Sequence, residues 1–144
     1  MDATTHTSES LSHFSLLSWN LHAPLGSPRV HSRLQGFLKQ VDLCTPTIVS
    51  VQEVYSGKLL LLSFHSALDF LRSEMEARGY DAHVSANIDG HVGVSSGLAT
   101  FVKRGLVEVG SCEEKPFDEG KHRSFQCLKI ALHNTHFLLL KVHL

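Results

Sequence analysis

The sequence predicts a mixed α/β fold, in which a mixed sheet is flanked by helices. In the first half of the chain, apolar residues follow a strand-helix-strand-helix order, and a run of strand-like segments follows. The α/β unit and the later hairpin-like segments together favour a sheet with both parallel and antiparallel pairs. The 144 residues, 42% of them hydrophobic and 19% charged, are enough to bury the core of one globular domain.

The elements of the first half are set by apolar spacing and by Pro and Gly. Residues 14–20, FSLLSWN, form a strand-type run that stops at a loop rich in Pro and Gly. Apolar residues then recur at helical spacing over 29–42, and TIVSVQEV at 47–54 is typical of a buried strand. Residues 57–78 predict a second helix, which Gly79 would cap.

Strands dominate the second half. YDAHVSA, at 80–86, predicts a strand, and the Gly- and Ser-rich residues 87–97 predict a loop. Three more strands are predicted at 98–103, 106–111 and 124–132. HNTH, at 133–136, predicts a hairpin turn, and FLLLKVHL, at 137–144, predicts the last strand.

Charge and the chain terminus exclude several classes of protein. Thirteen basic and fourteen acidic residues give a net charge of −1, which is not the footprint of a protein that wraps nucleic acid, although it is compatible with a local basic patch. Three cysteines form no paired framework and indicate a reducing compartment. Residues 1–13 predict a flexible polar tail without a signal sequence, and the apolar segment 59–71 is too short to span a bilayer. We therefore expect an intracellular protein with no transmembrane segment.

Two polar side chains at strand ends carry the functional signal. Asn20 ends the first predicted strand, and Glu53 lies near the end of the second. An unpaired buried carboxylate is costly, so Glu53 should have a partner or lie at a solvated rim. Ligand sites in such sheets gather at strand ends, and amide and carboxylate oxygens suit Mg²⁺. The sequence thus predicts a site for Mg²⁺ or Mn²⁺ at Asn20 and Glu53.

These stretches resemble the endonuclease/exonuclease/phosphatase superfamily, which includes deoxyribonuclease-I-like nucleases, inositol polyphosphate phosphatases and neutral sphingomyelinases. The resemblance is carried by LLSWNLHAP, TIVSVQEVY, RGY and SSGLATFVKRG. It implies a four-layer α/β sandwich, of which this chain would form part, and metal-dependent hydrolysis of a phosphoester. It also implies that Glu53 is the metal-binding glutamate and Asn20 the asparagine near the metal and the scissile phosphate.

Two more residues take roles from the resemblance. Arg123 would contact the phosphate and stabilise the transition state. His143 would replace the histidine of a strand that usually ends Asn-Thr-His-Leu. The sequence departs from the family pattern at Lys141 and Val142, which replace Asn and Thr, and at Thr47, where an aspartate is common.

The resemblance covers residues 14–144 and corresponds to the N-terminal half of the family's catalytic domain. The family's second half supplies an Asp/Asn pair, a further aspartate and a Ser-Asp-His motif, whose histidine activates water. The chain reaches Leu144 before these motifs. We therefore expect a fragment, a truncated gene model or a degenerate copy that is inactive alone and self-associates through its last strand.

The substrate and the functional class stay open. The motifs SWNLHAP, RGY and SSGLATF favour a sphingomyelinase-like parent that acts on a phospholipid headgroup. The full-length protein would then contact a membrane surface. A nucleic-acid substrate, as in a nuclease-type member, and a phosphoinositide phosphatase-type member are alternatives. A different class is a non-catalytic remnant that binds a partner.

Each site residue also has an ordinary structural interpretation. Asn20 alone is typical of a turn residue, and Glu53 alone is typical of a rim acid. Arg123 lies in a charged loop, where a solvated side chain is as good an interpretation as a phosphate ligand. A zinc site at His133 and His136 is disfavoured, because no cysteine or carboxylate is near them in the sequence.

Overall fold

The structure, a computed structural model, describes residues 14–22, 29–56, 67–84, 95–116, 124–132 and 135–142. Several sequence predictions fall elsewhere. The predicted tail at 1–13, the first part of the predicted second helix at 57–66 and most of the predicted loop at 87–97 lie outside the described residues.

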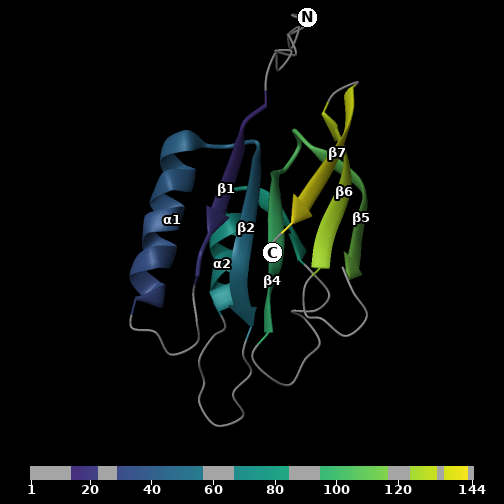
Figure 1. Cartoon of the computed structure of the whole chain (residues 1–144). Helices are drawn as coiled ribbons and strands as arrows, with labels where there is room; N and C mark the ends of the chain where they lie inside the picture. The colour runs from purple at the N-terminus through teal and green to yellow at the C-terminus, as the bar shows by residue number, and fades with distance from the viewer. Residues whose placement is uncertain are drawn as a thin grey trace, which may run out of the picture.

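The first sheet is mixed and carries both helices on one face. Its strands are β1 (Leu16–Asn20), β2 (Ile48–Ser56), β4 (Ser95–Lys103) and β3 (Tyr80–Val84), in the order β1-β2-β4-β3. The pair β1–β2 is parallel, while β2–β4 and β3–β4 are antiparallel. The helices α1 (Val30–Cys44) and α2 (Ala67–Ala77) lie on the face turned away from the second sheet (Figure 1). Within the described residues, neither helix is long and apolar enough to cross a membrane.

The second sheet is antiparallel and faces the first (Figure 1). It consists of β5 (Glu108–Pro116), β6 (Ser124–Leu132) and β7 (Thr135–Val142), in that order. The last two strands pair antiparallel, as predicted, but Thr135 and His136, which were expected in the turn, belong to β7 and pair with Leu132 and Ala131. The mixed α/β fold is thus confirmed, with two sheets and two helices in the described part of the chain.

Two more predicted boundaries are wrong: the strand predicted at 106–111 extends to Pro116 as β5, and the strand predicted at 98–103 begins at Ser95 as β4. Residues 95–97 were expected in a loop because Ser and Gly have low strand propensity, but they begin β4. They pair with residues 54–56 at the end of β2. Cross-strand pairing therefore overrides local propensity at this position.

Two apolar cores hold these layers together. The helix-side core packs α1 and α2 against the first sheet and includes Phe37, Leu71, Val49, Val51 and Phe101. The inter-sheet core lies between the two sheets and includes Ile48, Val102, Leu128 and Ile130. Neighbouring residues of β2 thus alternate between the two cores, as the period of a strand requires.

The outer face of β7 is exposed. Leu138, Leu140 and Val142 alternate with inward-facing residues and have exposed fractions of 64%, 57% and 41%. In the described part of the chain, no helix covers this face. The self-association expected from the sequence would use this apolar surface.

A β-bulge interrupts β2 at Glu53. Val51 pairs with Ala99 and Val54 pairs with Gly97, so Gln52 and Glu53 together oppose the single residue between them on β4. The backbone of Glu53 is left-handed, with φ +53°. The extra residue lets Val51 and Val54, three positions apart, both enter the helix-side core. The bulge therefore buries both valines and leaves the glutamate at the rim.

A buried lysine connects the two sheets next to this bulge. Lys141 of β7 is 4% exposed, and its Nζ donates to the carbonyl oxygens of Val51 at 2.5 Å and Ala99 at 2.6 Å. Burial lowers the pKa of Lys141 to about 7, from an ordinary value of 10.5. A second polar contact between the sheets joins Thr100 to Gln126, with 2.7 Å between their side-chain oxygens.

The buried lysine predicts a pH-dependent stability. Between pH 7 and 10.5 the unfolded chain binds a proton at Lys141 that the folded chain has released, so stability rises with pH. We expect the free energy of unfolding to rise by up to about 1.4 kcal/mol per pH unit from pH 7 to about 8.5. Above that range the thiol of Cys112, whose pKa is raised by burial, acts in the opposite direction. Urea unfolding of the wild type and of Lys141→Met tests this, and an equal slope in both proteins would contradict it.

The left-handed backbone at Glu53 predicts an unusual order of stability. Glu53→Gly and Glu53→Ala both remove the carboxylate, but only glycine adopts a positive φ without a steric cost. We expect the glycine variant to be more stable than the alanine variant by about 1 kcal/mol. Denaturant midpoints would show the difference. In a regular strand alanine is the better residue, so an alanine variant of equal or higher stability would mean that the bulge is not formed.

Candidate functional site

Parallel pairing brings Asn20 and Glu53 to the same edge of the first sheet. The register of β1 and β2 runs from Leu16 opposite Ile48 to Asn20 opposite Gln52, so both carboxyl ends meet there. The amide Nδ2 of Asn20 donates to Oε1 of Glu53 at 2.9 Å. Two residues that are 33 positions apart in sequence therefore form one polar pair, as the strand-end argument predicts.

The orientation of the Asn20 amide is set by the backbone. Its Oδ1 accepts a hydrogen bond from the backbone N–H of His22 at 2.8 Å, which leaves the NH₂ group to face Glu53. Asn20 thus positions the carboxylate in this arrangement, and Glu53 is the group that can offer oxygen to a cation. A direct metal contact by Asn20 stays a prediction.

His22 is a third member of the site that the sequence analysis did not select. Its Nδ1 lies 2.7 Å from Oε2 of Glu53, and its side chain is 64% exposed whereas that of Glu53 is 18% exposed. The backbone of His22 is left-handed, with φ +37°, and its carbonyl accepts a hydrogen bond from Arg33 of α1. The only signal in the sequence was its place two residues after Asn20.

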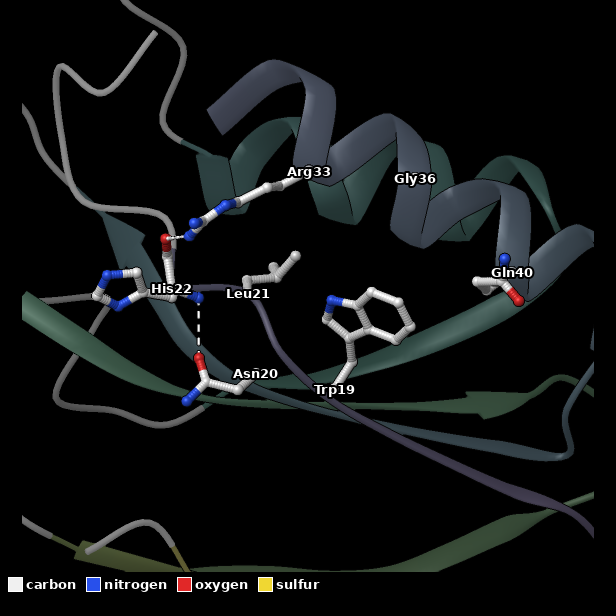
Figure 2. Close-up of a pocket in the computed structure, with 7 residues that line it drawn as sticks. All are labelled: Trp19, Asn20, Leu21, His22, Arg33, Gly36 and Gln40. Carbon is white, nitrogen blue, oxygen red and sulfur yellow. Dashed lines mark hydrogen bonds between the residues drawn. The ribbon is translucent and has the colours of Figure 1, made fainter. Parts of the chain in front are cut away.

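A cavity of about 510 Å³ lies beside this cluster, between β1 and α1 (Figure 2). Trp19 and Leu21 point toward α1, while Asn20 lies on the other side of the strand. Glu53 does not line the cavity. The cavity and the carboxylate are neighbours, because Asn20 and His22 line the cavity and also contact Glu53. The lining residues are Trp19, Asn20, Leu21, His22, Arg33, Gly36 and Gln40.

The donor set fits Mg²⁺ or Mn²⁺ better than zinc. No group of three or more His, Cys, Asp and Glu side chains that could hold a metal occurs within the described residues. Zinc sites need three or four such ligands, whereas Mg²⁺ is held by one or two carboxylates together with water and substrate phosphates. A carboxylate accepts about four hydrogen bonds, so the contacts of Glu53 with Asn20 and His22 are compatible with a cation on the same group.

The other two predicted site residues, Arg123 and His143, lie outside the described residues. Their roles stay predictions. β6 begins at Ser124, as predicted, whereas β7 spans Thr135–Val142 instead of the predicted 137–144. Phe125 pairs with Val142, so these two strand ends lie next to each other at one edge of the second sheet.

Sequence comparison identifies no relative: neither a protein-family model nor a curated protein sequence matches the chain.

Solved structures are similar to it at low sequence identity. An endonuclease/exonuclease/phosphatase family protein from Leptotrichia buccalis has a TM-score of 0.69 at 14% identity, over 92% of this chain and 54% of its own. D. rerio TDP2 complexed with single-strand DNA product has a TM-score of 0.66 at 18% identity, over 88% and 44%. ANGEL2, a 2′,3′-cyclic phosphatase in complex with adenosine-2′,3′-vanadate, has a TM-score of 0.64 at 16% identity, over 91% and 41%.

These similarities cover nearly all of this chain but about half, or less, of each solved structure. The chain has the deoxyribonuclease-I-like fold of the endonuclease/exonuclease/phosphatase proteins, over the part of that fold which it spans.

Proposed function

We propose that Asn20 and Glu53 belong to the metal-binding part of a phosphoester hydrolase site that uses Mg²⁺ or Mn²⁺. The observation that carries this proposal is the Asn20–Glu53 hydrogen bond of 2.9 Å at the carboxyl ends of two parallel strands. The fold, which this chain shares with endonuclease/exonuclease/phosphatase proteins, supports it. Residues 14–144 would then form one portion of such a domain.

Each side chain has a defined task in this proposal. Glu53 would hold the cation, which when bound neutralises charge that develops on a phosphate. Asn20 holds Oε1 of Glu53 in place, and His22 contacts Oε2, so the carboxylate is fixed at both oxygens. Arg123 would bind the phosphate, and His143 would lie at the end of the strand that leads into the site.

Two classes of phosphoester substrate follow from different observations. The similar structures solved with a single-strand DNA product and with adenosine-2′,3′-vanadate support a nucleic-acid-derived phosphoester. The net charge of −1 and the sphingomyelinase-like motifs support a phospholipid headgroup. We propose the nucleic-acid-derived phosphoester first, with a sphingomyelin-type headgroup as the second candidate.

Metal binding tests the site directly. Isothermal titration of the chain with Mn²⁺ should show saturable binding, and Glu53→Gln should weaken the affinity about tenfold or more, because it removes the charged ligand. Asp81→Asn is a matched control, since Asp81 is an exposed carboxylate paired with Arg104 at 2.8 Å, away from this site. Equal affinities of Glu53→Gln and the wild type would remove Glu53 from the metal site.

Ligand binding in the presence of Mn²⁺ separates the two substrate classes. A labelled single-strand oligonucleotide should bind to the wild type more tightly than to Glu53→Gln, while vesicles of phosphatidylcholine with sphingomyelin should not distinguish them. The reverse pattern would favour the phospholipid. A wild-type chain that binds neither Mn²⁺ nor these ligands would support the non-catalytic, partner-binding alternative.

A further inference from the structure

Lys141 makes a contact that ordinary inter-sheet packing does not require. It lies on β7, opposite Gln126 of β6, and extends across the core to the first sheet. Its Nζ reaches the carbonyl oxygens of Val51 and Ala99, which are direct partners on β2 and β4. One amine thus connects three strands of both sheets.

The place of this contact is the start of the bulge. The Val51–Ala99 pair is the last regular pair before the register shifts, and Glu53 follows Val51 by two residues. A bulge locally disrupts the ladder, so the carbonyl groups beside it depend on other donors when they are buried. Val51 and Ala99 are both fully buried. Lys141 supplies N–H donors to both carbonyl oxygens at this point.

The strained backbone of Glu53 needs such an anchor. A left-handed conformation in a residue other than glycine persists only where the surrounding structure enforces it. On the other side of β2, Leu21 donates from its backbone N–H to the carbonyl of Gln52 at 3.0 Å. The bulge is therefore held from β1 through Leu21 and from the second sheet through Lys141.

We propose that Lys141 is a positioning residue for Glu53: its buried amine fixes the Val51–Ala99 pair and thereby holds the bulge that places the carboxylate at the rim. That this placement serves cation binding rests on the proposed function. The positioning of the bulge is argued from the contacts of Lys141 and does not depend on cation binding. Burial of the lysine amine costs desolvation free energy, which its two hydrogen bonds to the carbonyl oxygens of Val51 and Ala99 offset.

Amide hydrogen exchange tests whether Lys141 holds the bulge. Lys141→Met keeps an unbranched side chain, one atom shorter than that of lysine, and removes the donor. Thr100→Val is the matched control, because it removes the inter-sheet hydrogen bond between Thr100 and Gln126 and leaves the side chain of Lys141 unchanged. We expect exchange at residues 51–54 to be about tenfold faster in Lys141→Met than in Thr100→Val, with no such difference in α1. Equal exchange at residues 51–54 in the two variants would overturn the proposal.

A second variant covers the case in which Lys141→Met does not fold. Lys141→Gln keeps an N–H donor but on a shorter side chain. Amide exchange at residues 51–54 should therefore also be faster in this variant than in Thr100→Val. Exchange no faster than in the control would again count against Lys141 as the anchor of the bulge.

Mn²⁺ affinity tests whether the bulge controls cation binding by Glu53. Lys141→Met should bind Mn²⁺ about tenfold more weakly than Thr100→Val, although Lys141 does not contact the cation site. Equal affinities in these two variants would show that the bulge does not control the carboxylate. If the wild type itself binds no Mn²⁺, the proposed function fails, and hydrogen exchange alone still decides whether Lys141 holds the bulge.

Discussion

The β-bulge at Glu53 is the constraint on which the site depends. In a regular strand, residues three positions apart face opposite sides of the sheet. Val51 and Val54 nevertheless both lie in the helix-side core, which is geometrically consistent only because β2 contains an extra residue between them. That extra residue allows an acid to sit in an apolar strand without being buried in either core. The cost is a left-handed backbone at Glu53.

The surroundings of Glu53 explain how this arrangement is tolerated. Its carboxylate meets an amide N–H from Asn20 and the imidazole of His22, so it is not left as a desolvated, isolated charge. Both partners come from the chain at the end of β1, which parallel pairing places beside β2. Lys141 acts from the opposite side by binding the carbonyl of Val51. Elements from both sheets therefore converge on one short segment.

The same segment carries the proposed function. Proteins with this fold include a phosphatase and a protein solved with a DNA product, and the paired amide and carboxylate of this chain lie at the strand ends where such sheets place their ligands. One partly exposed carboxylate is a sufficient protein ligand for a cation that keeps most of its water molecules. The exposed leucines of β7 lie on the outer face of the second sheet, away from the inward-facing Lys141.

The sequence alone determined the order of the elements and the pair at the strand ends. Apolar spacing predicted α1 and β2, and Asn20 and Glu53 were recognisable because polar residues that end apolar runs stand out locally. Tertiary structure decided the rest. Residues 95–97 are strand because they pair with β2, His22 lies in the site with a left-handed backbone, and Lys141 reaches the bulge from the second sheet. These features depend on contacts between segments that are distant in the sequence, so the local sequence around each residue does not predict them.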